Sequence, residues 1–202
     1  MTCPLRAFVL AVALMAGLVA LASAQSPAPD PAPPPIPSAP PAPSTPAPGD
    51  PFGEELTLNA KRIIYLKGNS TWDTAYDTLV DAFKSLYAFL DKEGIKRAGP
   101  SMTIYTQADD TGFQFQAAVP IDRTPKSAPQ GDMAIGQSPS GKALKFLHRG
   151  SYDSMDNTYE AITNHLDAKR LEAQEVFVEE YETDLVDTPE DKLVVYVYVP
   201  IK

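Results

Sequence analysis

The chain has 202 residues, with 17 lysines and arginines against 26 aspartates and glutamates, and its formal net charge is −9 at pH 7. An acidic chain without a run of basic residues repels nucleic acid, so we expect no nucleic-acid partner. Cys3 is the one cysteine, and it lies within the leader described next. A mature protein without cysteine has no disulfide framework, thiolate nucleophile or cysteine metal site.

Residues 1–24 have the pattern of a secretory signal peptide. Arg6 precedes an apolar run over residues 7–22, and Ala22-Ser23-Ala24 has the small-x-small form of a cleavage site. We expect cleavage after Ala24, which would change the net charge from −9 to −10 because Arg6 is lost. The protein would then be periplasmic or secreted, with no stable membrane span. Retention of the run as an anchor is the alternative, although it is shorter than the roughly 20 residues that span a bilayer.

Residues 25–53 are predicted to be a disordered linker rich in proline and alanine. Of the 21 prolines of the chain, 13 fall between residues 26 and 51. Such a segment lacks the backbone donors for a helix or a sheet ladder, and it lacks the apolar bulk to collapse. We expect a semi-extended spacer. A ligand for a proline-binding partner in the cell envelope is the alternative.

The globular part is predicted over residues 54–202 and belongs to the α+β class. A first strand is expected over residues 56–66, with its end set by Gly68. The next segment has apolar residues at helical spacing, and Gly94 is placed to end that helix. The helical stripe consists of Trp72, Tyr76, Leu79, Phe83, Leu86 and Leu90. Large side chains on such a stripe form part of a core.

Two hairpins and a second helix complete the predicted domain. Strands over residues 101–107 and 113–120 flank a polar turn, and the Pro-, Gly- and Ser-rich segment 122–141 is expected to be a loose linker. The second half repeats the order strand, helix, hairpin. It consists of a strand over 143–149 that ends at Gly150, a stripe of Met155, Tyr159, Ile162 and Leu166, and strands over 175–183 and 193–200. The predicted fold is two β-α-β-β (SHS2-like) repeats that pair about a pseudo-twofold axis, with a ligand cleft between them.

The strand near the C-terminus carries a candidate ligand-binding group. Its period of two places Phe177, Glu179 and Tyr181 on one face, so that a carboxylate stands between two aromatic rings. Aromatic faces attract a cation by about 0.5 to 2 kcal/mol, and a half-buried carboxylate needs a positive or hydrogen-bonding group opposite it. The alternative is a solvated strand face. Glu180 and Glu182 point to the opposite face, where we expect them to be exposed to solvent.

Several short motifs occur in an order and spacing that resemble a known family. In the second half these are Phe146-Leu147-His148-Arg149-Gly150-Ser151-Tyr152, then Tyr159, then Glu179-x-Tyr181-x-x-Asp184, then Tyr198-Val199-Pro200-Ile201. In the first half they are Gly68, Trp72, Gly94-Ile95, Gly99-Pro100 and Tyr105. From about residue 56 to residue 202, the chain resembles the GyrI-like (gyrase-inhibitor-like) effector-binding domain.

This resemblance implies a double β-α-β-β domain with a hydrophobic cleft, found in bacteria on multidrug-responsive transcription activators and as free-standing proteins. In that family the glutamate of the Glu-x-Tyr motif pairs with cationic lipophilic ligands among stacked aromatic rings. The matching residues here are Glu179 and Tyr181. The implied aromatic walls are Phe177, Tyr105, Tyr152 and Trp72.

The chain also departs from the family pattern. It shows no DNA-binding domain, and its leader would remove it from gyrase and promoters, so the regulatory role does not transfer. Asp184 is followed by Leu185, where the family often has proline, which changes the expected hairpin geometry. We therefore expect an exported protein that binds amphipathic, cationic, aromatic small molecules in order to sequester or sense them, without a cofactor or metal.

Three other functions remain open at this point. Some free-standing members of the resembled family hydrolyse strained electrophilic toxins, and Glu179 with a raised pKa would serve as acid or base. Binding and turnover need the same residues, so nothing in the sequence separates them, and we expect a binding protein with an enzyme as the alternative. Haem or tetrapyrrole binding, known from similar SOUL-type domains, would depend on His148 or His165, which show no metal-ligand spacing. The last alternative is a protein-docking module on a tether.

Overall fold

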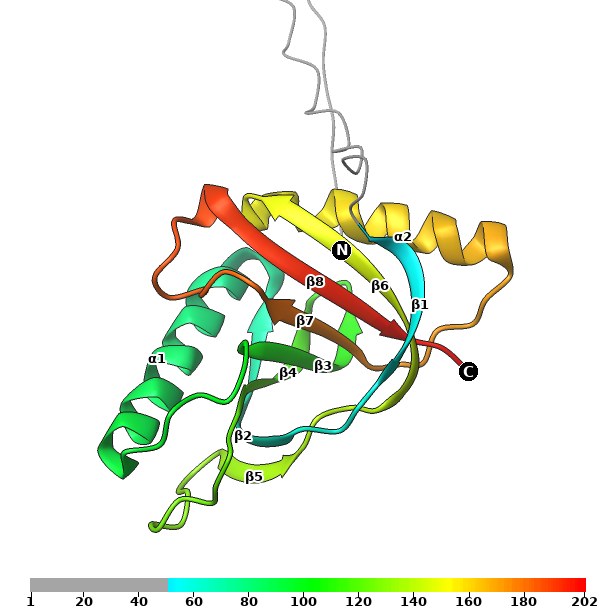
Figure 1. Cartoon of the computed structure of the whole chain (residues 1–202). Helices are drawn as coiled ribbons and strands as arrows, with labels where there is room; N and C mark the ends of the chain where they lie inside the picture. Colours follow the sequence, from blue (N-terminus) through cyan, green and yellow to red (C-terminus); the bar gives the residue numbers. More distant parts are fainter. Residues whose placement is uncertain (1–50) are drawn as a thin grey trace, which may run out of the picture. The chain divides into compact units, whose positions relative to one another are not determined.

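A computed structural model describes residues 51–202 (Figure 1). The predicted signal peptide and most of the predicted linker lie outside the described residues. The described part contains one eight-stranded antiparallel sheet and two helices. The strands are β1 (Phe52–Leu58), β2 (Arg62–Thr71), β3 (Met102–Asp109), β4 (Gly112–Pro120), β5 (Met133–Gln137), β6 (Gly141–Gly150), β7 (Phe177–Tyr181) and β8 (Leu193–Pro200). The helices are α1 (Ala75–Glu93) and α2 (Met155–Lys169), and three short 3-10 turns are η1 (Trp72–Thr74), η2 (Tyr152–Ser154) and η3 (Glu190–Lys192).

Helix α1 carries the predicted stripe from Tyr76 to Leu90, whereas Trp72 lies in η1, before the helix begins. Leu79, Phe83 and Leu86 are fully buried in the main core. The helix ends where Gly94 takes a left-handed conformation with φ of 62°, which lets its N–H bond the carbonyls of the last turn. Helix α2 ends in the same way at Arg170, with φ of 55°, so this end carries no glycine signal in the sequence. In the described part of the chain, neither helix is both long and apolar enough to cross a membrane.

Two predicted segments differ from the structure. The strand expected over residues 56–66 is two strands, β1 and β2, and Gly68 lies inside β2 instead of ending it. A Cβ at Gly68 would stand 2.5 Å from the ring of Phe115, so the glycine provides space for that ring. The expected linker 122–141 contains β5, which pairs with β2. This short edge strand has mostly half-exposed side chains and hence little apolar periodicity.

The order of strands in the sheet is β1-β6-β8-β7-β3-β4-β2-β5. The predicted hairpins β3–β4 and β7–β8 are present. The two halves of the chain pair with each other at two places, where β3 pairs with β7 and where β1 pairs with β6. Helix α1 packs on β2 and β4, and α2 packs on β6. Both helices contribute to one main core, which lies between them and the sheet.

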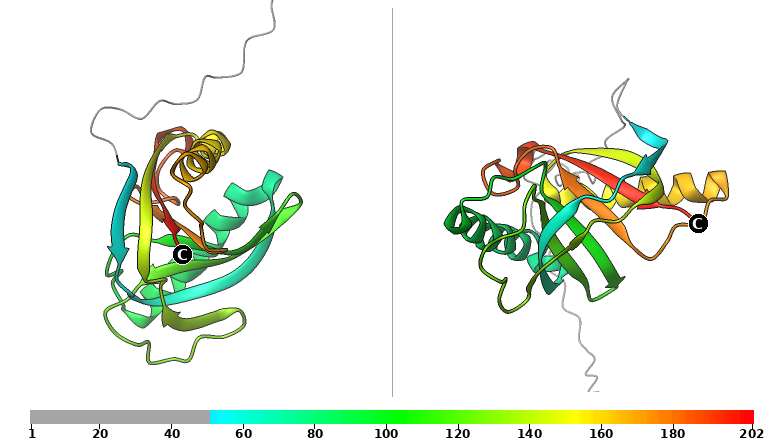
Figure 2. Two further views of the ribbon diagram at one scale, coloured as in Figure 1. Left: turned by 90° about the vertical axis from the view of Figure 1, so that its right-hand side faces the viewer. Right: turned by 60° about the horizontal axis from the view of Figure 1, so that its bottom comes forward.

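The sheet is strongly curved (Figure 2). Short connections join β1 to β2 and β5 to β6. These two connections lie next to each other, because the N–H of Lys61 in the first donates to the hydroxyl of Ser138 in the second over 2.9 Å. Because of this curvature, a second apolar cluster is buried that contains no helix residue. Its members are Ile63, Met102, Ile104, Ala118 and Val178. The face of the sheet away from the helices is therefore not a solvated face.

Candidate functional site

Glu179 lies at the centre of the sheet. It is on β7, where it pairs with Thr103 of β3 on one side and Val197 of β8 on the other. Its side chain is on the side of the main core, and the residue is 1% exposed. A carboxylate this deeply buried must find hydrogen-bond donors, because it has lost its water.

Four tyrosine hydroxyls supply those donors, and we call these four side chains the tyrosine cage. Tyr105 of β3, Tyr181 of β7 and Tyr152 of η2 donate to Oε2 over 2.9, 2.9 and 3.2 Å. Tyr159 of α2 donates to Oε1 over 2.5 Å. The Tyr105 and Tyr152 hydroxyls also lie 2.8 Å apart, and the Tyr181 hydroxyl lies 2.8 Å from that of Thr103.

Burial controls the charge of this cluster. It raises the pKa of the Glu179 carboxyl above its usual range, and the hydrogen bonds from the cage oppose that shift. Burial, followed by the nearby charge of Glu179, raises the pKa of all four cage hydroxyls well above the ordinary tyrosine value. The tyrosines therefore stay protonated, and their O–H groups remain donors to the carboxylate.

A cavity of about 370 Å³ opens above Glu179. It lies between the start of α1, the start of α2 and the central strands β3 and β7. Its lining consists of Trp72, Asp73, Ala75, Tyr76, Tyr105, Tyr152, Asp153, Met155, Asp156, Tyr159 and Glu179. Within residues 51–202 this lining holds four carboxylates and no lysine or arginine. The volume suits a small organic ligand, and five of the eleven lining residues are aromatic.

Four of the six predicted site residues line the cavity: Glu179, Tyr105, Tyr152 and Trp72. Trp72 is 44% exposed, and its indole N–H donates to the carbonyl of Asp109 over 2.8 Å. Its ring lies beside the opening, where a bound molecule would reach it.

The other two predicted site residues, Phe177 and Tyr181, lie behind the wall. The Phe177 ring stacks on that of Tyr105 with centroids 4.5 Å apart, and its centroid is 5.3 Å from that of Tyr159. The Tyr181 ring packs edge-on against Phe83. Tyr181 acts on Glu179 through its hydroxyl and does not line the cavity.

Two tyrosines of the site were not predicted from the sequence. Tyr159 and Tyr76 were interpreted as members of helical stripes, and both line the cavity. Neither ring is fully buried, and Tyr76 packs on Tyr152 with centroids 5.7 Å apart. A hydroxyl on an otherwise apolar stripe at the start of a helix is the signal that could have identified Tyr159, because a buried tyrosine O–H needs a partner.

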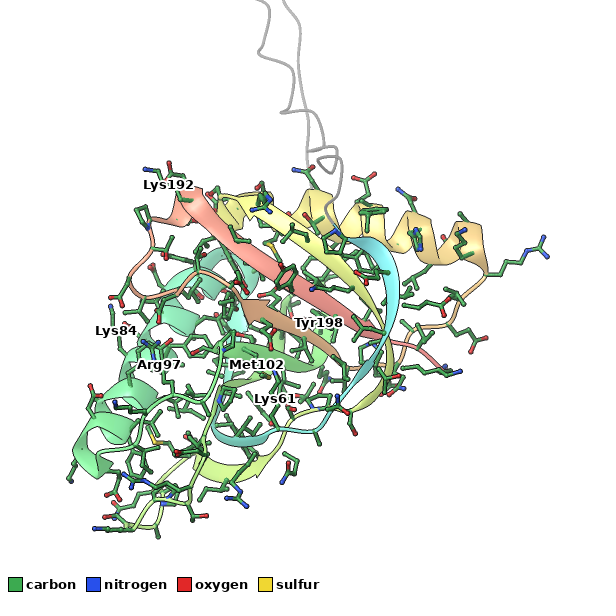
Figure 3. The ribbon with its side chains drawn as sticks, in the orientation of Figure 1. Lys61, Lys84, Arg97, Met102, Lys192 and Tyr198 are labelled. Carbon is green, nitrogen blue, oxygen red and sulfur yellow. The ribbon has the colours of Figure 1, made fainter. Side chains whose placement is uncertain are left out.

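The expectation for Glu180 was wrong. Its side chain is only 12% exposed and pairs with Lys61 over 2.7 Å. It also accepts a hydrogen bond from the Tyr198 hydroxyl over 3.2 Å. Figure 3 labels Lys61 and Tyr198 on the side of the sheet turned toward the viewer. The curved sheet covers this side as well, which a strand alternation alone does not predict. Glu182 is exposed, as expected.

The two histidines have packing contacts. His148 is buried between β6 and α2, and the ring of His165 lies edge-on to Phe52 and Phe146. Within residues 51–202, no three His, Cys, Asp or Glu side chains are grouped closely enough to hold a metal ion.

The chain belongs to the GyrI-like family, because the model of the GyrI-like small molecule binding domain matches residues 54–202. No curated protein sequence matches this chain. Among solved structures, it is similar to EcmrR in a DNA complex, with a TM-score of 0.63, 13% identity and coverage of 74% of this chain and 56% of that one. The described chain thus spans little more than half of EcmrR.

Two further similar structures match almost over their whole length. SAV2435, solved bound to tetraphenylphosphonium, has a TM-score of 0.52 at 14% identity, with 74% of this chain and 93% of that chain covered. A hydrolase encoded by lin2189 from Listeria innocua has a TM-score of 0.54 at 13% identity, with 75% and 93% covered. At these identities the similarity shows a shared fold.

Proposed function

We propose that this protein binds amphipathic, aromatic organic cations in the cavity above Glu179. One observation carries the proposal: a carboxylate that is 1% exposed stands at a cavity with aromatic walls and no basic residue in its lining. In such a low-dielectric setting a charge that cannot reach water attracts an opposite charge strongly. The rings add cation–π attraction of about 0.5 to 2 kcal/mol each.

The tyrosine cage narrows the class of cation. Oε2 of Glu179 already lies within hydrogen-bond distance of three hydroxyls, and Oε1 accepts from a fourth. Little acceptor capacity is left for the N–H groups of a primary ammonium or guanidinium. A cation without N–H donors, such as a quaternary ammonium or phosphonium, needs no hydrogen bond from this carboxylate and so forms no weaker complex for the lack of one. The phosphonium bound to SAV2435 belongs to that class.

We also propose that the domain is an internal duplication whose halves pair about a pseudo-twofold axis. From one edge to the centre, the sheet has the strand order β1-β6-β8-β7, and from the other edge to the centre it has the order β5-β2-β4-β3. The two orders have the same pattern, so that β6 corresponds to β2, β8 to β4 and β7 to β3. In each half the helix follows the second strand of this order. The cavity lies where the starts of α1 and α2 meet, which are equivalent positions in the two halves. Such an arrangement supports the expected ligand cleft between the repeats.

We propose further that the protein acts outside the cytoplasm, to sequester or sense its ligand, with residues 25–53 as a spacer. The pattern of residues 1–24 supports export. Mass spectrometry of the protein from a periplasmic extract tests this point. A mature N-terminus at Gln25 is expected, whereas an intact Met1 in a cytoplasmic fraction would overturn it.

Hydrolysis is the second candidate, because the burial-raised pKa of Glu179 suits an acid or base that faces a cavity. The observed hydrogen bonds favour binding, since the four tyrosine hydroxyls occupy most of the acceptor positions through which the carboxylate would hold an attacking water. Incubation of the protein with a strained electrophile, followed by mass spectrometry, separates the two. Hydrolysed product formed in proportion to enzyme, and lost in Glu179→Gln, would establish turnover.

The test of binding is a calorimetric titration with tetraphenylphosphonium, with Trp72 fluorescence as a second signal. Glu180→Gln is a matched control, because Glu180 is the next carboxylate on β7 and points away from the cavity. We expect Glu179→Gln to lose about 1–3 kcal/mol of binding free energy and Glu180→Gln to bind like the wild type. Equal affinities of all three proteins, or no binding by the wild type, would overturn the proposal.

A further inference from the structure

His148 is a buried imidazole outside the cavity, with both nitrogens bonded. It lies on β6, and the residue is 1% exposed. Its Nε2 is 3.1 Å from the carbonyl oxygen of Ser151, and its Nδ1 is 2.7 Å from the hydroxyl of Thr158. A carbonyl oxygen only accepts, so Nε2 carries the hydrogen, and Nδ1 accepts from the Thr158 hydroxyl. Burial lowers the pKa of His148, which keeps the ring in this neutral form.

Both partners of His148 are direct chain neighbours of cage tyrosines. Ser151 precedes Tyr152, and Thr158 precedes Tyr159. The imidazole on β6 therefore holds two segments in place: the backbone just before η2, through Ser151, and the first turn of α2, through Thr158. The Ser154 hydroxyl donates to the same Ser151 carbonyl over 2.6 Å, which ties this segment together further.

The cage tyrosines are held in two different ways. Tyr105 and Tyr181 lie on β3 and β7, whose backbones are fixed by ladder hydrogen bonds on both sides. Tyr152 and Tyr159 lie on η2 and α2, which have no side-chain cap at their N-termini. Their hydroxyls still come within 3.2 and 2.5 Å of the Glu179 oxygens. Such short contacts require that the start of α2 be placed accurately on the sheet.

We propose that His148 is a positioning residue for ligand binding: through Ser151 and Thr158 it holds the Tyr152 and Tyr159 hydroxyls on Glu179. His148 does not line the cavity, so it acts through these tyrosines alone. The consequence for affinity rests on the proposed function. The positioning itself concerns the protein without ligand, and it is tested separately.

The test uses Thr158, because a change of His148 itself risks the fold. Thr158→Val keeps the shape and removes the hydroxyl, and Thr158→Ser keeps the hydroxyl. Ser138→Ala is a control that removes a similarly buried hydroxyl from the connection between β5 and β6, away from the cage. All variants are titrated with tetraphenylphosphonium at a temperature where circular dichroism shows them folded.

We expect Thr158→Val to weaken binding by roughly three- to tenfold, while Thr158→Ser and Ser138→Ala bind like the wild type. In a Glu179→Gln background, Thr158→Val should have little further effect, since the cage then has no carboxylate to orient. Unchanged affinity in Thr158→Val, or equal losses in Thr158→Val and Thr158→Ser, would show that the hydroxyl serves stability only.

A measurement without ligand separates this inference from the proposed function. The ζ-carbon NMR signals of labelled tyrosines report on each hydroxyl. In Thr158→Val we expect the signals of Tyr152 and Tyr159 to move, while that of Tyr181, held by Thr103, stays in place. If the wild type binds no cation and these signals move, positioning stands and the proposed ligand is wrong. If they do not move, His148 has no positioning role.

Discussion

The Tyr159 hydroxyl donates to Oε1 of Glu179 over 2.5 Å, and this bond joins helix α2 to the central strand β7. The other three cage tyrosines donate to Oε2. One carboxylate thus connects a helix, a 3-10 turn and two strands beneath a cavity. The ligand site and the packing of the domain share this one buried charge.

Tyr159→Phe should destabilise the protein by about 1–3 kcal/mol, because the buried Oε1 loses its donor while the ring still fills its place. Urea denaturation measures the change. Tyr76→Phe is the matched control: Tyr76 also lines the cavity from the start of a helix, and its hydroxyl makes no hydrogen bond within residues 51–202. It should unfold at the same urea concentration as the wild type. Equal losses in both variants would contradict a special role for the Tyr159 bond.

Glu179 should make stability fall as pH rises. Burial raises its pKa in the folded protein above the ordinary glutamate value of 4.5, so between the unfolded and the folded pKa the native state binds more protons. The stabilisation from the protonated form is complete below the unfolded pKa and is lost as pH rises through the folded one. Above pH 4.5 we expect the free energy of unfolding to fall less steeply with pH in Glu179→Gln than in the wild type. A steeper fall in the variant would contradict this prediction.

Cation affinity should have the opposite pH dependence. The ligand needs the ionised carboxylate, so binding of tetraphenylphosphonium should strengthen as pH rises through the raised pKa of Glu179. Calorimetric titrations from about pH 5 upward, at one fixed ionic strength, measure the affinity at each pH. The residual affinity of Glu179→Gln should stay flat over the same range. If the affinity of that variant changed with pH as much as the affinity of the wild type, a group other than Glu179 would be responsible and the prediction would be wrong.

The exposed carboxylates of the cavity rim should speed association. Asp73, Asp153 and Asp156 line the opening and carry the same sign as Glu179. We expect Asp153→Asn combined with Asp156→Asn to lower the association rate of the cation by roughly two- to fivefold at low salt, with the difference vanishing near 1 M salt. Asp167→Asn, at the far end of α2, is the control. Stopped-flow Trp72 fluorescence gives the rates, and a loss that salt does not reduce would contradict steering.

Gly68→Ala should destabilise the domain by about 1–3 kcal/mol, because the new Cβ would overlap the ring of Phe115. Gly99→Ala is a suitable comparison, since its Cβ would stand 3.6 Å from the nearest atom of Pro120. Urea denaturation of the two variants measures the difference. A Gly68→Ala protein as stable as Gly99→Ala would show that the Phe115 ring moves aside easily.

Local periodicity predicted the elements that bury a continuous face. The α1 stripe ends at Gly94, and both hairpins are present, because these features depend on near neighbours in the chain. The short edge strand β5 was missed, since its pairing with β2 comes from tertiary structure and leaves little pattern. The same limit explains why Gly68 was interpreted as a strand end, although it makes room for a ring from another strand.

The candidate site was only partly predictable for a related reason. The alternation on β7 brought Phe177, Glu179 and Tyr181 together, but it did not show which of them faces the cavity. Tyr159 looked like a packing residue because a helical stripe gives no sign of what its hydroxyl meets. Its role depends on how α2 lies on the sheet, and that is decided by contacts such as those of His148.

The central claim is that the buried charge of Glu179 selects cations. The most direct test compares tetraphenylphosphonium with tetraphenylborate, two ions of nearly the same shape and opposite charge, by calorimetry on the wild type and on Glu179→Gln. We predict that the wild type binds the phosphonium at least about tenfold more tightly than the borate, and that the variant loses most of this preference. Equal binding of both ions by the wild type, or a preference that survives in the variant, would contradict the claim.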